Sequence, residues 1–205
     1  MSASAITTLF LDIGGVLLTN GWDTNSRKKA YKQFGLDSAE VEERHHLTFS
    51  VYEEGDISLD EYLNRTVFYT KQNFSKAEFK TFMFAESKAL PGSIDFFKQL
   101  KSDHQLKVYA VSNEAKEINE HRIKTFELNK LFDAYISSCY VHIRKPNNEI
   151  LQMACDISQT KPEHGLYIDD RLMFVQLADK FGMQALQFTE LGKIKEEIKQ
   201  FSFHK

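Results

Sequence analysis

The sequence of 205 residues is poor in cysteine, in long apolar runs and in net charge. Its two cysteines, Cys139 and Cys155, are too few for a disulfide framework, and no C-x-x-C pair occurs. No stretch approaches the roughly 18 consecutive apolar residues that span a membrane, so we expect no membrane partner. A net charge of -3 leaves no positive footprint for nucleic acid. These absences argue against a secreted disulfide scaffold, a membrane protein and a nucleic-acid-binding protein.

The N-terminal segment and the histidines lack two further signals. No basic residue precedes the first apolar run, so we expect no signal peptide and, given the few cysteines, a cytoplasmic protein. The seven histidines show neither an H-x-x-x-H pair nor a Cys/His metal spacing. The adjacent His45 and His46 are therefore expected on a solvated helix face. Hydrophobic residues make up 42% of the chain, which is enough for a sizeable core.

A short apolar run near the N-terminus stops abruptly at an acidic residue. Leu9–Leu11 is typical of a buried strand, Asp12 follows it directly, and Gly14 and Gly15 come next. A carboxylate at the carboxyl end of a buried strand lies where open α/β sheets bind ligands. The glycines let the backbone turn sharply and approach a ligand closely. Taken alone, Asp12 could equally cap a helix, so the rest of the chain decides between the two interpretations.

Strands alternate with helices in the second part of the chain. We expect strands at 106–111, 133–137, 165–168 and 184–188, each followed by apolar residues at helical spacing. Such alternation predicts an α/β fold with a doubly wound, Rossmann-like parallel sheet.

The region between the first two strands carries helix signals only. Ser58–Glu61 and Ser75–Glu78 read as capping boxes, each followed by apolar residues at helical spacing. We therefore expect residues 20–89 to form a helical domain inserted into a core domain of residues 1–19 and 90–205.

Polar residues stand at the carboxyl ends of the expected strands: Asp12, Ser112, Lys145 just past a strand, and the pair Asp169-Asp170. In a parallel sheet these ends share one edge, so the side chains should converge. A carboxylate can attack phosphorus and form an acyl phosphate, while a hydroxyl and an ammonium can stabilise the phosphoryl oxygens. Asp12 with Asp170 can hold Mg²⁺, which prefers oxygen ligands. Each residue alone also has an ordinary explanation as a cap or a surface charge.

This order of motifs resembles the haloacid dehalogenase superfamily of hydrolases. The matching pieces are the apolar strand with Asp12, the segment VYAVSN containing Ser112, the triplet RKP at 144–146 and YIDD at 167–170. The resemblance spans nearly the whole chain, and the helical insert stands where that family carries its helical cap. The segment EGDIS at 54–58 and the RKP triplet are most similar to the bacterial sugar-phosphate (glucose-1-phosphate) phosphatases of the superfamily.

The resemblance implies a Mg²⁺-dependent phosphatase that acts on a small phosphorylated metabolite such as a sugar phosphate. Asp12 would be the nucleophile and a metal ligand. The backbone carbonyl of Gly14 and the carboxylates of Asp169 and Asp170 would complete the metal site.

The remaining matched residues would handle the phosphoryl group. Ser112 would bind it, with Asn113 near it, and Gly15 would let the backbone come close to the substrate. Lys145 would stabilise both the nucleophile and the phosphoryl charge. Monomer and dimer are both compatible with these motifs.

Two positions depart from the family pattern. Phosphatases of the family usually have an aspartate as general acid and base where this chain has Gly14, and such catalysis is worth about 10²–10⁴-fold. We therefore expect esters whose leaving groups need no proton to be favoured. Phe174 stands where many relatives have Asn or Asp, which leaves the metal loop less well held. Asn20, Trp22 and Arg44 are candidates for substrate contacts from the insert, with ordinary packing or surface placement as the alternative.

Two other functions stay open. A 2-haloacid dehalogenase uses the same aspartate to attack carbon and needs no metal, but relatives with that activity have Tyr at the position of Gly14 and Ser-Asn at 169–170. A chain without the acid at position 14 could also bind metal or phosphate without catalysis. Turnover of a generic phosphate ester with Mg²⁺ separates these readings.

Overall fold

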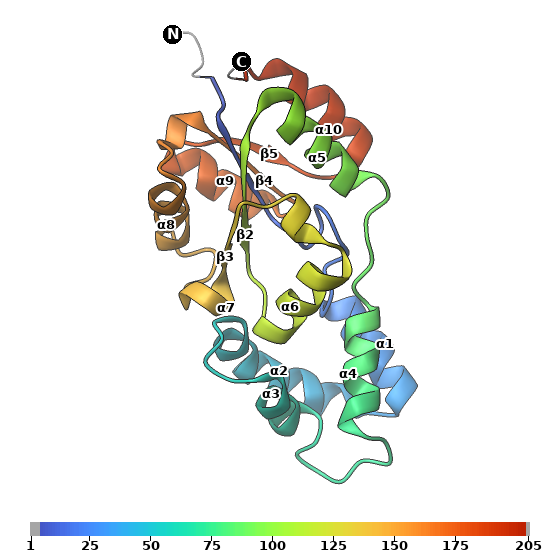
Figure 1. The fold of residues 1–205 in the computed structure, drawn as a ribbon. Helices are drawn as coiled ribbons and strands as arrows, with labels where there is room; N and C mark the ends of the chain where they lie inside the picture. The colour runs from blue at the N-terminus through green and yellow to red at the C-terminus, as the bar shows by residue number, and fades with distance from the viewer. Residues whose placement is uncertain (1–4, 204–205) are drawn as a thin grey trace.

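The computed structural model describes residues 5–203 and is built around a parallel sheet (Figure 1). The strands are β1 (Thr8–Leu11), β2 (Lys107–Ser112), β3 (Ala134–Ser137), β4 (Gly165–Asp169) and β5 (Gln184–Gln187). They pair in the order β3-β2-β1-β4-β5, and each neighbouring pair is parallel. The prediction of a doubly wound α/β sheet is therefore confirmed. Residues 1–4 and 204–205 lie outside the described residues. The expectation that the N-terminus is not a signal peptide concerns the first of these segments, and the two outer ends of the expected core domain fall in both.

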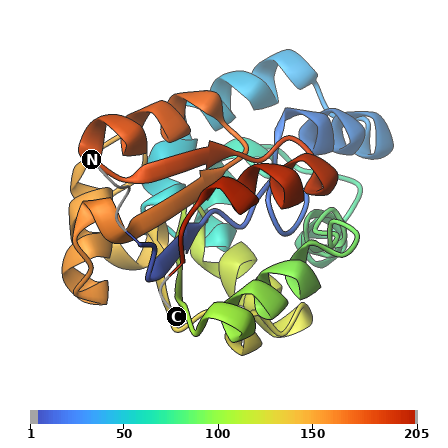
Figure 2. The ribbon, with the colours of Figure 1, turned by 90° about the horizontal axis from the view of Figure 1, so that it is seen from above.

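Helices cover both faces of this sheet (Figure 2). One face carries α5 (Ser93–His104), α6 (Lys116–Thr125) and α10 (Leu191–Glu197), and the other carries α8 (Glu149–Ser158) and α9 (Leu172–Phe181). The central strand shows why both faces are covered. Leu9 and Leu11 point into one apolar core and Phe10 into the other, because successive strand residues face opposite sides of a sheet.

The first four helices after β1 form a bundle at one end of the molecule (Figure 1). Its helices are α1 (Thr24–Phe34), α2 (Ser38–Glu53), α3 (Leu59–Thr66) and α4 (Lys76–Ala85). Aromatic side chains such as Tyr62 and Phe79 fill its core. The capping box predicted at Ser75 is complete, whereas Ser58 only accepts from the Glu61 N–H, because the Glu61 side chain pairs with Arg65 instead.

Two of the places where the bundle touches the sheet domain show how the two parts are joined. The connecting chains pair at Thr19, whose N–H donates to the Lys88 carbonyl at 2.8 Å. At the second place the end of α2 meets α7 (Ser138–Val141), where the Ser138 hydroxyl donates to the Glu53 carbonyl at 2.6 Å. A Cβ on Gly55 would overlap the backbone of Cys139. The two backbone segments therefore approach so closely that only glycine fits at position 55.

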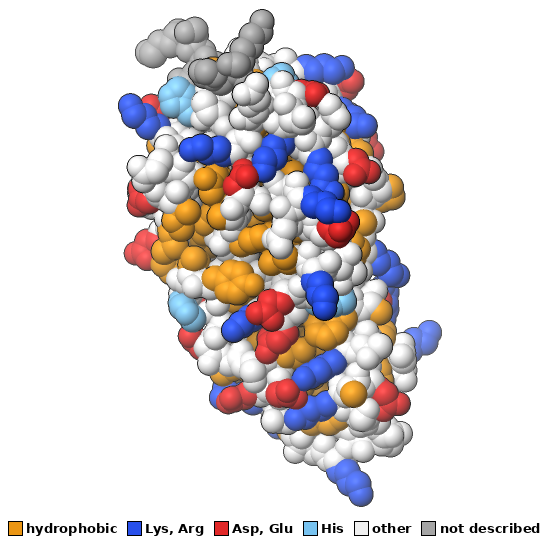
Figure 3. Space-filling model, in the orientation of Figure 1, with side chains coloured by type: hydrophobic (Ala, Val, Ile, Leu, Met, Phe, Trp, Pro, Cys, Tyr) orange, Lys and Arg blue, Asp and Glu red, His pale blue; other side chains and the backbone are white. Residues whose placement is uncertain are grey.

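Short 3-10 turns complete the chain at Leu128–Lys130, Pro162–His164 and Ile198–Gln200. Within the described residues, no helix is both long and apolar enough to cross a bilayer. On the face that Figure 3 shows, acidic and basic side chains are interspersed, which agrees with the small net charge.

Candidate active site

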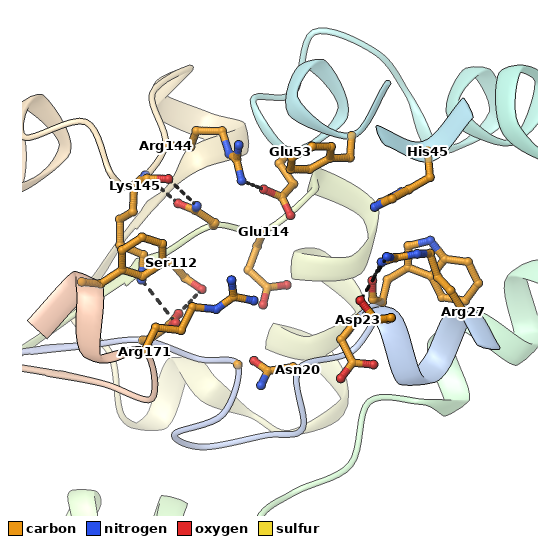
Figure 4. Close-up of a pocket in the computed structure, with 17 residues that line it drawn as sticks. Asn20, Asp23, Arg27, His45, Glu53, Ser112, Glu114, Arg144, Lys145 and Arg171 are labelled. Atoms are coloured by element: carbon orange, nitrogen blue, oxygen red, sulfur yellow. Dashed lines mark hydrogen bonds and ion pairs between the residues drawn. The ribbon is translucent and has the colours of Figure 1, made fainter. Parts of the chain in front are cut away.

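Asp12 is the centre of the candidate site. It follows the central strand β1, and only 7% of the residue is exposed. Its Oδ1 accepts hydrogen bonds from the Ile13 N–H at 2.7 Å and from the Ser112 hydroxyl at 2.5 Å. Its Oδ2 lies 3.2 Å from Nζ of Lys145. Side chains from three separate segments of the chain thus meet at one edge of the sheet (Figure 4).

Lys145 is buried against several oxygen atoms and an aromatic ring. Its Nζ donates to Asp169 Oδ2 at 2.6 Å, to the Val111 carbonyl at 3.0 Å and to the Tyr167 hydroxyl at 3.1 Å. The centre of the Phe174 ring lies 4.9 Å away. The ring at position 174, expected to leave the metal loop less well held, therefore makes a cation–π contact with the ammonium.

The expectation that Lys145 lies just past a strand is wrong. β3 ends at Ser137, and α7 and three further residues intervene before the lysine. Asn113 sets the position of Lys145 instead, because its Oδ1 accepts the Lys145 N–H at 2.8 Å and its Nδ2 donates to the Lys145 carbonyl at 2.9 Å. Both ends of the Asn113 amide are thereby engaged in holding the loop, rather than pointing free towards a ligand.

Asp169 closes the other side of the site from the end of β4. Its Oδ2 accepts from Lys145 and from the Tyr167 hydroxyl, the latter at 2.6 Å, and its Oδ1 accepts from the Arg171 N–H at 2.8 Å. Burial works to raise the pKa of Asp169, but Lys145 and these hydrogen bonds lower it overall. Asp169 is therefore a firmly held carboxylate.

Asp170 is less fully satisfied. Its Oδ2 accepts from Asn20 Nδ2 at 2.9 Å, while its buried Oδ1 has no hydrogen-bond partner. Oxygen atoms of Asp12, Asp169 and Asp170 all lie within 4.8 Å of one another. A buried, unpartnered carboxylate oxygen beside two further carboxylates matches the ligands that a hard divalent cation prefers. The residues present therefore fit Mg²⁺.

The charges of the site are unequal, since one ammonium faces three carboxylates. Burial raises the pKa of Asp12 to about 7, although Lys145 opposes the rise, and burial also raises the pKa of Asp170. Burial alone would lower the pKa of Lys145, but Asp12 and Asp169 raise it above its ordinary value. A cation bound between these carboxylates would relieve their mutual repulsion.

The two glycines after Asp12 have different surroundings. Gly15 has φ of 72°, and a Cβ there would overlap the Asp170 carboxylate. The structure thus gives Gly15 a reason other than the expected substrate contact, namely room for Asp170. Gly14 has no positive φ, and a Cβ on it would lie 2.8 Å from Asn20 Oδ1 and 3.8 Å from Arg122 Nη1.

A cavity of about 270 Å³ opens in front of Asp12, between the sheet edge and the helical bundle (Figure 4). The bundle side of its lining consists of Trp22, Asp23, Thr24, Arg27, His45, Phe49 and Glu53. Two of the three residues predicted to contact substrate from the insert, Asn20 and Trp22, line it. The third does not, because Arg44 pairs with Glu40 and lies over the Tyr69 ring.

The expectation that His45 is solvated is wrong, although His46 is exposed. Nδ1 of His45 lies 2.7 Å from the Tyr62 hydroxyl, which also accepts the Trp22 indole N–H at 2.9 Å. Burial lowers the pKa of His45 to about 4, so the ring is neutral near pH 7. The buried Tyr62 then donates its own hydrogen to Nδ1, which leaves Nε2 protonated as a donor.

Sequence reasoning missed two ion pairs at the cavity, one half-buried and one almost fully buried. Arg144 Nη2 lies 2.7 Å from Glu53 Oε2 and thereby joins the core to α2. Arg122 Nη1 pairs with Glu114 Oε1, and both residues are almost fully buried. Glu114 stands two residues after Ser112, at the end of β2, and this position was a sequence signal that could have placed Glu114 at the site.

Comparisons with known proteins agree with this geometry. A family model described as haloacid dehalogenase-like hydrolase matches residues 6–181. (S)-2-haloacid dehalogenase 4A from Burkholderia cepacia is 26% identical over 109 residues, which is 53% of this chain and 47% of that protein. The match therefore spans about half the length of that relative.

Two solved structures share the fold at lower identity. A HAD family enzyme from Bacteroides thetaiotaomicron, in complex with magnesium and inorganic phosphate, is 20% identical with a TM-score of 0.79, over 93% of this chain and 99% of that one. L-2-haloacid dehalogenase from Xanthobacter autotrophicus is 17% identical with a TM-score of 0.63, over 95% and 83% respectively.

Proposed function

The chain belongs to the haloacid dehalogenase-like hydrolases, and from this premise we propose that it is a Mg²⁺-dependent phosphatase. Its substrate is a small phosphorylated metabolite, and the phosphoryl group is carried on Asp12. The observation that supports this most is the unpartnered, buried Oδ1 of Asp170 within the cluster of three carboxylates. Hydrolysis of a carbon–halogen bond needs no such cation site, whereas phosphoryl transfer gains directly from one.

The first step is the attack of Asp12 on phosphorus. Oδ1 is held by the Ile13 N–H and by Ser112, which leaves Oδ2 as the oxygen that reacts. The Lys145 ammonium, 3.2 Å from Oδ2, stabilises the charge that develops on the phosphoryl oxygens. Asn113 contributes by fixing the backbone of Lys145.

Asp12, Asp170 and the Gly14 carbonyl are the proposed metal ligands. Mg²⁺ bound there supplies positive charge that neutralises the phosphoryl oxygens. Asp169 supports the site by holding Lys145, and Gly15 by leaving room for Asp170.

We assign residues 20–89 the role of a cap over a core of residues 1–19 and 90–205. The cavity lies between the two, and its volume of about 270 Å³ suits a small molecule such as a sugar phosphate. Polar groups on the cap side, among them Arg27 and His45, can donate to hydroxyl groups of such a substrate. A cytoplasmic location stays a prediction from the sequence.

A 2-haloacid dehalogenase is the second candidate, because the curated relative from Burkholderia cepacia carries that name. The same carboxylate of Asp12 would then attack carbon. Against this candidate stands the acidic pair Asp169-Asp170, together with Gly14 in place of the tyrosine of such relatives.

The deciding experiment assays the purified chain on a panel of phosphorylated metabolites and on 2-chloropropionate, with Mg²⁺ or with EDTA. We expect phosphate release that EDTA abolishes and Mg²⁺ restores, and no release of chloride. Chloride release in EDTA would replace the phosphatase by the dehalogenase. Mg²⁺ binding without release of either product would indicate a non-catalytic protein.

A further inference from the structure

A buried carboxylate lies next to the position where the family's general acid is missing. Glu114 comes two residues after Ser112, is 6% exposed and lines the same cavity as Asp12 and Gly14. Figure 4 shows its side chain directed into the cavity. The residue therefore brings an ionisable group from the end of β2 to the reacting edge of the sheet.

Arg122 lies between Glu114 and the position that a Cβ on Gly14 would take. A Cβ on Gly14 would lie 3.8 Å from Arg122 Nη1, and that same nitrogen binds Oε1 of Glu114. Arg122 is itself fixed, because its Nε donates to the Ser87 hydroxyl at 3.0 Å and its Nη2 to the Thr19 carbonyl at 2.9 Å. The Glu114 carboxylate thus reaches from β2 the neighbourhood that an aspartate at position 14 would reach from β1.

Other ionisable groups on the cavity wall are less suited to proton transfer. Asp23 caps α1 by accepting the Ser26 N–H at 2.8 Å, and Glu53 reaches the cavity from the end of α2 rather than from a strand end beside Asp12. Both come from the insert. Burial raises the pKa of Glu114 even though Arg122 opposes the rise, which makes the protonated form more accessible than in an exposed glutamate.

We propose that Glu114 is the general acid and base of the hydrolysis, in place of the aspartate that Gly14 lacks; this inference rests on the proposed phosphatase function. As Asp12 bonds to phosphorus and the bond from phosphorus to the ester oxygen breaks, the Glu114 carboxyl gives its proton to that oxygen and the alcohol leaves. A water molecule then bonds to phosphorus and gives its proton to the Glu114 carboxylate. The bond between phosphorus and Asp12 breaks, phosphate leaves, and both carboxyl groups regain their starting states.

The test compares an alkyl phosphate with an aryl phosphate whose leaving group needs no proton. Glu114→Gln keeps an oxygen that can accept from Arg122 but cannot transfer a proton. We expect its kcat on the alkyl phosphate to fall about 10²-fold or more. On the aryl phosphate the first step is kept and the second is slowed, so rapid mixing shows a burst of released phenol. Acid-quenched samples then show the mass of a phosphorylated chain.

Glu117→Gln is the matched control. Glu117 lies one turn further on, in α6, and its Oε1 accepts the Leu59 N–H at 2.8 Å, an interaction that glutamine retains. The Glu117→Gln substitution thus makes the same chemical change in a half-buried glutamate that does not line the cavity. We expect this variant to keep both rates, to show no burst, and to carry no phosphoryl group when quenched.

A second variant tests whether Glu114 performs the task of the missing aspartate. Gly14→Asp is sterically feasible, because position 14 has no positive φ and the nearest obstacle is the movable end of the Asn20 side chain. In the Glu114→Gln background we expect it to restore the alkyl phosphate rate at least about tenfold, with Arg122 pairing with the new carboxylate.

The outcomes separate the inference from the function on which it rests. Glu114→Gln losing equal factors on both substrates, with no burst and no rescue by Gly14→Asp, would make the Glu114–Arg122 pair structural and overturn the inference alone. Wild-type protein that releases no phosphate overturns both. Circular dichroism and thermal melting check each fold. Should Glu114→Gln unfold, Glu114→Asp keeps the charge for Arg122 and should still slow the first-turnover release of the alkyl alcohol more than that of the phenol; equal losses in that first turnover would again overturn the inference.

Discussion

The two walls of the cavity are built in different ways. On the core wall Ser112 and Lys145 are each 1% exposed, Asp169 behind Lys145 is fully buried, and most of their polar atoms have hydrogen-bond partners. On the cap wall Trp22 and His45 are half-buried and share a single hydroxyl group, that of a tyrosine within the bundle. In the proposed phosphatase the chemistry would therefore depend on groups that are held in common, whereas recognition would depend on side chains of the helical bundle.

Replacing Asp12, on the core wall, should have the largest effect on phosphate release. We expect Asp12→Asn to lower phosphate release by on the order of 10⁴-fold or more, because an amide is a poor nucleophile. Since burial raises the pKa of Asp12 to about 7, the ionised carboxylate destabilises the metal-free protein, and the variant should melt at a higher temperature without metal.

Phosphate assays and thermal melting in EDTA check both parts of this prediction. The control is Asp103→Asn, which changes an exposed residue of α5. A lower melting temperature for Asp12→Asn would show that its hydrogen bonds outweigh the repulsion between the carboxylates.

Lys145→Met should be the next largest change, and it affects both chemistry and stability. The variant leaves the carboxylates of Asp12 and Asp169 buried without their cation, which typically costs about 3–5 kcal/mol in the free energy of unfolding. Loss of a preorganised charge should lower kcat about 10²–10³-fold. Urea denaturation and steady-state kinetics measure the two effects. Lys116→Met, on the exposed side of α6, should stay within about 0.5 kcal/mol of the wild type.

The pH dependence of the free energy of unfolding should report the burial of His45 on the cap wall. The pKa of His45 falls from 6.5 to about 4 on folding, so the unfolded chain binds a proton that the folded chain does not. The contribution of His45 to the free energy of unfolding should therefore decrease as pH falls from about 6.5 to about 4. After allowance for partial exposure we expect on the order of 1–2 kcal/mol. Urea denaturation of His45→Gln should show a smaller fall over this range, and an unchanged fall would contradict a neutral, buried ring.

The smallest effect is expected for a change on the cap wall that alters KM and not kcat. Phe49 lines the cap side of the cavity, and its ring lies 4.8 Å from the Arg144 guanidinium. We expect Phe49→Leu to raise KM for the preferred substrate about three- to fivefold and to leave kcat nearly unchanged, because Phe49 takes no part in the proposed chemistry of Asp12 and Lys145. An equal fall in kcat would join the cap wall to the chemistry and weaken the contrast between the walls.

The core wall could be predicted from the sequence because each of its strands is a recognisable apolar run. Buried apolar runs end at Asp12, at Ser112 and at Asp169, and the parallel alternation places those ends together. Lys145 was misplaced along the chain, because the four-residue helix α7 is too short to show helical periodicity.

The cap wall and the Glu114–Arg122 pair could not be predicted in this way. The faces of α2 are nearly equal in hydrophobicity, so the pattern does not tell which face turns inward, and His45 was expected in solvent. How the bundle sits on the sheet decides this, through contacts such as Glu53 with Ser138 that join distant parts of the chain.

The amide of Asn113, which holds the backbone of Lys145, bears on how such a chain can vary over evolutionary time. A lysine presented directly by its strand would need a fixed spacing from that strand. Here the spacing is set from β2, so residues 138–144 can gain or lose length while the ammonium keeps its place. That segment also faces the bundle through Ser138, so we expect insertions after Ser138 to reshape the cavity mouth while Asn113 keeps Lys145 in place. In the proposed phosphatase, changes in the length of this loop would then alter specificity as long as Asn113 is kept.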